Sequence, residues 1–214
     1  MKHYGYFRSS AAYRVRIALA LKELPHDFIS VHLKKDGGQH QKPDYLSLNP
    51  QGLVPTLITN NGVALTQSLS IIEYLDEVHP TPAFLPSDPL GRAKVRAIAQ
   101  AIACDIHPVN NLRILDYITG PLGGSKEDML IWYKHWINEG FRGLEGLLQA
   151  SSHGKFCYGD TPGLADICLV PQVFNAQRFN CDLSAFPRSV EIASRGNEMP
   201  AFANAAPGKQ PDAE

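Results

Sequence analysis

The residues that could do chemistry gather at one junction near the N-terminus. Residues 3–7 are apolar, Arg8, Ser9 and Ser10 follow at once, and residues 11–22 are rich in Ala, Leu and Arg. We predict a strand that runs directly into a helix, with hydroxyl groups and an arginine between them. Amide N–H groups and the positive end of the helix dipole favour an anion at such a helix start. The same field lowers the pKa of a thiol.

The junction itself contains no cysteine. The chain has four cysteines, and they show neither a C-x-x-C pair nor a metal-ligand spacing. They are Cys104, Cys157, Cys168 and Cys181. We predict no metal site and expect buried, reduced thiols, with a redox role for Cys157 or Cys181 as the alternative. A thiolate that acts at the junction must therefore arrive on a bound molecule.

Two other places could hold such a molecule. Val54-Pro55 lies where a strand should begin. A trans bond is the ordinary form there, whereas a cis bond would offer the amide and carbonyl of Val54 to a peptide-like ligand. Gln67-Ser68 opens a helix, where Ser68 is either a simple N-cap or part of a carboxylate site. Together with the junction, these places suit a ligand with a thiol, a peptide bond and a carboxylate, such as glutathione.

The elements that must position these residues alternate between strand and helix in the first part of the chain. Period-two patterns and turn signals predict strands, and apolar spacing predicts helices. The strands are expected at 3–7, 28–33, 53–58 and 63–65, and the helices at 11–22 and from Ser68 onward. This order predicts one compact α/β unit.

The pattern changes after the proline-rich residues 79–86, which mark a domain boundary. Helical patterns cover residues 90–117, 126–149 and 164–178, and the last is apolar enough to be central in its domain. The segment Asp160-Thr161-Pro162 is expected to supply its N-cap and a first-turn proline. The polar tail from Pro207 onward is expected to be frayed.

Composition excludes several classes of function. The chain has 214 residues, 44% of them hydrophobic, and a formal net charge of −1, which indicates neither a nucleic-acid nor a membrane surface. No apolar run approaches the roughly 20 residues that span a bilayer. The N-terminal residues lack the features of a signal peptide, so we predict a cytoplasmic protein.

Several of these motifs together resemble the zeta class of the glutathione transferases. The resemblance covers nearly the whole chain. It is carried by Ser9-Ser10, residues 14–19, Asn49-Pro50, residues 54–57 and 67–75, Gly159-Asp160 and residues 164–172. The junction and the run at 169–172 are more specific to the zeta class than Val54-Pro55 or Gln67-Ser68.

The resemblance implies a fold of α/β plus all-α class. A thioredoxin-like domain at 1–82 would bind glutathione, and an all-helical transferase domain would occupy 88–214. A homodimer and a cis Val54-Pro55 bond are also implied. Glutathione would contact Ser9, Ser10, Val54, Gln67 and Ser68, with the Ser9 hydroxyl donating to its sulfur. His40 stands where the family often contacts the glycine end, although a solvent-exposed loop histidine remains the alternative.

The resemblance also implies a reaction. Zeta-class isomerases convert maleylacetoacetate or maleylpyruvate from cis to trans by reversible thiolate addition to the double bond. Such a small dicarboxylate diketo acid needs cations, and Arg8 and Arg178 are candidates. Residues 105–113 resemble a run that lines the site in bacterial isomerases, which implicates His107, Asn111 and Arg113. For Arg113 and Arg178, a surface salt bridge is the alternative.

One position departs from the family. Ala11 stands where the zeta pattern usually has a cysteine, so the protein itself offers no nucleophile there. Leu112 stands where some maleylpyruvate isomerases have an arginine, which slightly favours maleylacetoacetate. Asp166 resembles the buried capping aspartate of the transferase helical domain and is expected to serve folding.

Two other functions remain open. The first is a general glutathione transferase that conjugates small electrophiles such as α-haloacids. The second is a non-catalytic binding protein built on the transferase fold. The sequence does not decide between the cis substrates, and it does not name the pathway.

Overall fold

The structure, a computed structural model, describes residues 1–151 and 154–214, and their contacts divide into two units. Unit 1 contains Met1–Phe84 together with Met199–Glu214, and unit 2 contains Leu85–Glu198. The division between Phe84 and Leu85 falls inside the proline-rich residues 79–86. Our expected second domain, 88–214, included the segment 199–214, but that segment makes its contacts in unit 1.

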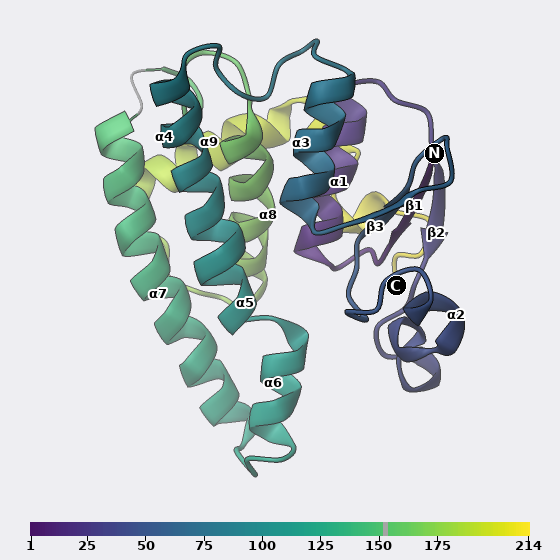
Figure 1. Cartoon of the computed structure of the whole chain (residues 1–214). Helices are drawn as coiled ribbons and strands as arrows, with labels where there is room; N and C mark the ends of the chain where they lie inside the picture. The colour runs from purple at the N-terminus through teal and green to yellow at the C-terminus, as the bar shows by residue number, and fades with distance from the viewer. Residues whose placement is uncertain (152–153) are drawn as a thin grey trace. The chain divides into compact units, whose positions relative to one another are not determined.

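Unit 1 is an α/β unit, as the sequence predicts, and its sheet is the frame for the site (Figure 1). The strand order is β2-β1-β3-β4, with β1 parallel to β2 and antiparallel to β3, and with β3 antiparallel to β4. The elements are β1 (Lys2–Gly5), α1 (Ser10–Leu21), β2 (Asp27–Ser30), α2 (Pro43–Leu46), β3 (Thr56–Ile58), β4 (Ala64–Thr66), α3 (Ser68–Val78) and α10 (Pro200–Ala203).

Helix α1 lies in the core of unit 1 and is buried along most of its length. Its apolar side chains Val15, Ile17 and Leu19 pack in the same unit as Ile71 and Leu75 of α3, all of them fully buried. Burial of this much apolar surface is the main driving force for folding.

Two arginines of α1 are buried as well, and each has polar partners in unit 1. Arg14 donates from Nη1 to the Ser68 hydroxyl over 3.3 Å. Arg16 donates from Nε to the Ala205 carbonyl over 2.8 Å and from Nη2 to the Phe7 carbonyl over 3.1 Å. A buried guanidinium requires such acceptors, so Arg16 has a structural role.

The C-terminal segment is ordered into the fold, so the prediction of a frayed tail was wrong. A short 3-10 turn forms at Pro207–Lys209, and Pro207 is buried. The Asp212 carboxylate accepts a hydrogen bond from the Phe7 amide over 3.1 Å. The polar composition of the tail suggested that it would not pack. Polar residues can nevertheless pack by accepting hydrogen bonds from donors that the core leaves unpaired.

His3 on β1 is a buried titratable group. Its side chain is fully buried, and neither ring nitrogen has a hydrogen-bond partner among the described residues. Its edge faces the rings of Phe28 and His26 at centroid distances of 5.8 and 6.0 Å. Burial, together with the nearby charge of Arg16, holds the pKa of His3 well below the usual 6.5.

This burial predicts a pH-dependent stability. The unfolded chain binds a proton at His3 near pH 6.5 and the folded chain does not, so protons favour unfolding. The free energy of unfolding should therefore fall by up to about 1.4 kcal/mol per pH unit below pH 6.5, until the lower folded-state pKa is reached. Urea titrations between pH 5 and 8 measure this slope, which His3→Leu should reduce. The matched variant of an exposed histidine, His135→Leu, should leave it unchanged.

Unit 2 is helical throughout its described secondary structure (Figure 1). Helix α8 is buried along nearly its whole length, which confirms its predicted central place. The helices are α4 (Pro89–Gln100), a π-helical turn (Ala101–Ile106), α5 (His107–Val109), α6 (Leu112–Thr119), α7 (Lys126–Ser151), α8 (Leu164–Arg178) and α9 (Pro187–Glu198). The helix predicted at 90–117 is thus interrupted.

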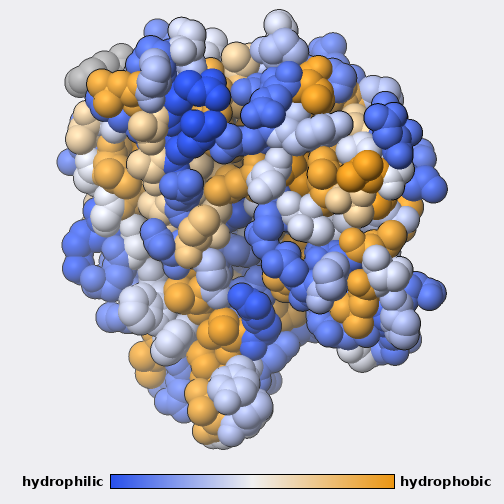
Figure 2. All heavy atoms as spheres, in the orientation of Figure 1, coloured by the Kyte–Doolittle hydropathy of each residue, from blue (hydrophilic) through white to orange (hydrophobic). Residues whose placement is uncertain are grey.

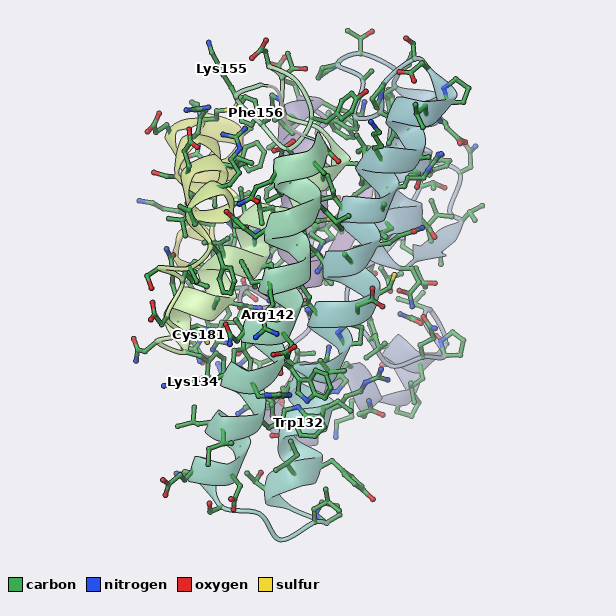
Figure 3. The ribbon with its side chains drawn as sticks, turned by 90° about the vertical axis from the view of Figure 1, so that its left-hand side faces the viewer. Trp132, Lys134, Arg142, Lys155, Phe156 and Cys181 are labelled. Carbon is green, nitrogen blue, oxygen red and sulfur yellow. The ribbon has the colours of Figure 1, made fainter. Side chains whose placement is uncertain are left out.

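The interruption at Asn110-Asn111 is held by a local cap and by hydrogen bonds from α7. Asn111 caps α6, because its Oδ1 accepts from the Arg113 amide over 3.2 Å. Helix α7 holds the turn from the other side: Trp132 Nε1 donates to the Val109 carbonyl over 2.8 Å, and Asn110 Nδ2 donates to the Tyr133 carbonyl over 3.4 Å. Trp132, Lys134 and Arg142 project from α7 in sequence order along its axis (Figure 3).

The N-terminus of α8 is capped from within the helix. Gly163 occupies the N-cap position, and the buried Asp166 accepts from the amides of Gly163 and Cys157, each over 2.8 Å. This confirms a folding role for Asp166. The predicted capping segment, Asp160-Thr161-Pro162, lies before the helix, and Asp160 accepts from the Lys155 amide over 3.2 Å.

The cysteines differ in exposure. Cys157 and Cys168 are buried as expected, and Cys181 is half-buried, but Cys104 is exposed, which corrects the prediction for that residue. Burial raises the pKa of both Cys157 and Cys181, which disfavours the reactive thiolate. Within the described residues, no group of His, Cys, Asp and Glu could hold a metal ion.

On the face drawn in Figure 2, hydrophobic and hydrophilic residues are interspersed and form no continuous apolar belt. Exposed apolar residues do occur on α6, on the loop after it and on α7, namely Tyr117, Leu122 and Ile131. No helix among the described residues is long and apolar enough to cross a membrane.

Candidate active site

The sheet of unit 1 brings four loops to one of its ends. Gly5, the last residue of β1, pairs with Ser30, the last residue of β2. Thr56, the first residue of β3, pairs with Tyr4 and with Thr66, the last residue of β4. The segments after β1, after β2, before β3 and after β4 therefore all leave the sheet at the same end. These segments contain Ser9 and Ser10, His40, Val54, and Gln67 with Ser68, respectively.

The first segment is a tight turn that delivers Ser9 to the start of α1. The Ser9 amide donates to the Tyr6 carbonyl over 3.0 Å, which closes the turn. Ser9 is the N-cap of α1, and its Oγ accepts from the Ala12 amide over 3.2 Å. Because this capping bond uses the hydroxyl oxygen as an acceptor, the hydroxyl hydrogen stays available to donate to an anion.

The groups beside Ser9 also favour an anion. The Ala11 amide, in the first turn of α1, has no hydrogen-bond partner among the described residues. The positive end of the α1 dipole lies at the same place. Arg8 is exposed, and its guanidinium lies 4.8 Å from the centre of the Phe7 ring. Ser10 is buried just inside the helix.

The segment before β3 ends in a cis Val54-Pro55 bond, as the family resemblance implies. The preceding carbonyl, that of Leu53, accepts from the Tyr45 hydroxyl over 2.6 Å and from Asn49 Nδ2 over 2.7 Å. The amide and carbonyl of Val54 have no partner among the described residues. An extended peptide could therefore add to this short stretch of backbone.

The segment after β4 leads into α3. Gln67 has φ 66° and ψ 118°, a left-handed conformation that is uncommon outside glycine. Its side-chain Nε2 donates to Gln51 Oε1 over 3.0 Å. Ser68 is the first residue of α3, so the N-cap position belongs to Gln67, and the Ser68 hydroxyl instead accepts from Arg14. Free amides at this helix start suit a carboxylate.

His40 lies on the loop between β2 and α2. It is half-buried, its Nδ1 has no partner among the described residues, and burial lowers its pKa. Burial therefore favours the neutral form of the ring. Gly38 makes room for it, because a Cβ at that residue would lie 3.0 Å from His40 Nδ1.

The candidates in unit 2 form two groups. His107, Asn111 and Arg113 lie on one turn, where Asn111 Nδ2 lies 3.4 Å from His107 Nε2. Arg113 is exposed. Arg178 is the last residue of α8, and its guanidinium lies 4.5 Å from the centre of the Phe179 ring.

Sequence reasoning missed the residues that hold these loops in place. The Leu53 carbonyl, next to Val54, is held by Tyr45 and Asn49. The Gln67 side chain is held by Gln51. Tyr45 belongs to the short helix α2, and Asn49 and Gln51 come from the segment between α2 and β3, where the sequence offers no periodic pattern. A polar residue in a loop that has a specific backbone partner is recognisable only once the chain has folded.

The geometry of unit 1 fits glutathione. A thiolate would meet the Ser9 hydroxyl and the Ala11 amide, a peptide unit would pair with Val54, and a carboxylate would meet the first amides of α3. The observation that tests this fit is the set of unpartnered backbone groups at Ala11 and Val54. They lie at the same end of the sheet.

Comparison with known proteins agrees with this geometry. Residues 8–78 match the family "Glutathione S-transferase, N-terminal domain". The probable maleylacetoacetate isomerase of Vibrio cholerae is 51% identical over 210 residues, which cover 98% of this chain and 97% of that protein.

Two solved structures match the whole chain. A maleylpyruvate isomerase described as a bacterial zeta-class glutathione transferase has a TM-score of 0.96 and 45% identity, with 100% of both chains covered. The maleylacetoacetate isomerase of Methylobacterium extorquens, solved with bound malonate and glutathione, has a TM-score of 0.95 and 38% identity, again with 100% of both chains covered. With its thioredoxin-like unit, its helical unit and these relatives, the chain belongs to the zeta class of the glutathione transferase family.

Proposed function

We propose that this protein is a glutathione-dependent cis–trans isomerase of maleylacetoacetate or maleylpyruvate. The observation that carries the proposal is the junction at Ser9, where a helix start and a free hydroxyl hydrogen favour a thiolate and no cysteine is present. The relatives named above are isomerases of these two substrates.

When bound, glutathione supplies the thiolate that adds to the cis double bond and leaves again after rotation. The chain's own residues have three tasks. Ser9 donates a hydrogen bond to the sulfur and, with the Ala11 amide and the α1 dipole, lowers the thiol pKa. Val54 pairs with the peptide backbone, and Gln67 and Ser68 hold a carboxylate at the start of α3.

Cations are needed for the substrate. Its carboxylates, and the negative charge that develops on a carbonyl oxygen, require positive or hydrogen-bonding groups. We assign this task to Arg8 and Arg178, since guanidinium groups bind carboxylates in bidentate fashion. His107, Asn111 and Arg113 are assigned to glutathione, and His40 to its glycine end. A dicarboxylate, malonate, is bound in the Methylobacterium relative, which supports a substrate of this class.

Assembly and location are part of the proposal. A homodimer follows from the family resemblance and is tested by sedimentation. A cytoplasmic location is consistent with the metabolic reaction of the relatives. Leu112 favours maleylacetoacetate as the substrate. We also propose a glutathione-binding domain that begins with residues 1–82 and is completed by residues 199–214, and a helical domain that begins at residue 88 and ends before residue 199.

The decisive experiment is a parallel assay of both cis substrates that measures product and remaining glutathione. An isomerase produces the trans acid, and the glutathione concentration stays constant. Steady loss of glutathione would indicate a conjugating transferase instead. No turnover of either substrate, together with glutathione binding by calorimetry, would indicate a non-catalytic protein.

A further inference from the structure

The turn that delivers Ser9 is held on both sides by side chains from elsewhere in unit 1. On one side, the Phe7 amide donates to Asp212 Oδ2 over 3.1 Å. On the other side, Arg16 donates from Nη2 to the Phe7 carbonyl over 3.1 Å and from Nη1 to the Tyr6 carbonyl over 3.5 Å. The Tyr6 carbonyl is the same group that accepts from the Ser9 amide.

Both holding residues are tied to the C-terminal segment 205–214. Asp212 is part of it, and Arg16 donates from Nε to the Ala205 carbonyl over 2.8 Å. Asp212 Oδ2 also accepts from the Ser30 hydroxyl over 2.8 Å, at the end of the neighbouring strand β2. Gln210 keeps the segment compact, because its Nε2 donates to the Asn204 and Ala206 carbonyls, each over 3.0 Å. In Figure 1 this yellow segment passes beside β1.

These contacts are more than surface packing. The Asp212 carboxylate gives the Phe7 amide, a backbone donor, an acceptor at a fixed place. Asp212 Oδ1 is buried and has no partner among the described residues, so the side chain is held by its other oxygen. A misplacement of a reacting group by about 1 Å can cost 100-fold in rate. Whatever fixes the Phe7 peptide therefore matters for the Ser9 hydroxyl.

We propose that Asp212 is a positioning residue, which fixes the turn at Tyr6–Ser9 through the Phe7 amide and thereby aims the Ser9 hydroxyl at the glutathione sulfur. The catalytic turn of the thioredoxin-like domain is thus completed by the C-terminal end of the fold, after the helical unit. This inference rests on the proposed function for the role of Ser9. The contacts that fix the turn do not depend on it.

Three variants separate the position of the Asp212 acceptor from its charge. Asp212→Asn removes the charge and keeps an acceptor at the same place. Asp212→Glu keeps the charge and displaces the acceptor by one methylene. Asp212→Ala removes both. Ser30→Ala is the matched control, because it removes the second partner of Asp212 and leaves the Phe7 amide bonded.

Three readouts are measured on the full-length protein. They are kcat and KM for isomerisation, the pKa of the bound glutathione thiol from its ultraviolet absorbance, and hydrogen exchange of the peptide that contains Phe7 and Ser9. Asp212→Glu and Asp212→Ala should lower kcat about tenfold or more, raise the thiol pKa and speed exchange in this peptide. Asp212→Asn and Ser30→Ala should stay within about threefold of wild type.

The opposite pattern overturns the proposal. If kcat falls in Asp212→Asn and not in Asp212→Glu, charge matters and position does not. Unchanged thiol pKa and exchange in Asp212→Glu also overturn it, and this variant keeps the test decisive if Asp212→Ala does not fold. If wild type shows no isomerisation, the proposed function fails, while thiol pKa and hydrogen exchange still test the role of Asp212.

Discussion

Replacing Ser9 with alanine should lower kcat for isomerisation by about 100-fold, with a smaller change in KM for glutathione. Removal of one hydrogen-bond donor from a site of developing charge typically costs 100- to 1,000-fold in kcat. The thiolate keeps the α1 dipole and the Ala11 amide in the variant, so we expect the lower end of that range. The pKa of bound glutathione, followed by thiolate absorbance, should rise in parallel.

Ser9 also caps α1, and its replacement must be separated from a loss of stability. An N-cap lost to alanine costs about 1 kcal/mol of stability. Ser9→Asn retains a capping side chain and lacks the hydroxyl, whereas Ser9→Thr retains both. If the hydroxyl matters for chemistry, Asn should be as slow as Ala, and Thr should approach wild type. An Asn variant as fast as wild type would contradict the assigned role.

Ala11 provides a matched control on the same turn of helix. Ala11→Cys restores the residue that the zeta pattern usually has there, and it leaves the Ser9 hydroxyl and the backbone amides in place. Isomerisation should change by less than about threefold, because the thiolate that reacts belongs to glutathione. Alkylation of the protein by α-haloacids, measured by mass spectrometry, should appear in this variant at residue 11.

The sequence predicted the order of elements in unit 1 because strands and helices have different hydrophobic periods. It suggested that the Ser9 junction, Val54-Pro55 and Gln67-Ser68 share a surface, but it did not predict the strand pairing that brings them to one end of the sheet. Tyr4 pairs with Thr56 and Thr56 pairs with Thr66, and no local pattern encodes pairing between distant strands. The cis form of Val54-Pro55 came from the family resemblance, since local sequence favours trans.

The two wrong predictions, an unbroken helix at 90–117 and a frayed C-terminal tail, share a physical cause. The break at Asn110-Asn111 and the docking of Asp212 both depend on a polar side chain or backbone group that finds a distant partner. Helical periodicity continues through Asn110-Asn111, and the polar composition of the segment that contains Asp212 suggests disorder. In both cases a tertiary hydrogen bond overrides a local tendency.

Asp166→Ala should produce a large loss of stability in unit 2. The variant leaves the amides of Cys157 and Gly163 without the carboxylate that now accepts from both. A buried donor left unsatisfied costs about 1–3 kcal/mol, so we expect a loss of about 2–5 kcal/mol in the free energy of unfolding. Such a loss is a large share of the 5–15 kcal/mol typical of a folded protein.

Asp160→Ala is the matched control for this prediction, because it removes a carboxylate from the same loop. Asp160 accepts from the Lys155 amide at an exposed site, where water replaces the lost partner. Its loss should cost less than about 1 kcal/mol. Urea denaturation of the two variants measures the difference as a shift in midpoint at constant slope. Equal losses in the two variants, or a greater loss at Asp160, would contradict the assignment of Asp166 as the capping carboxylate.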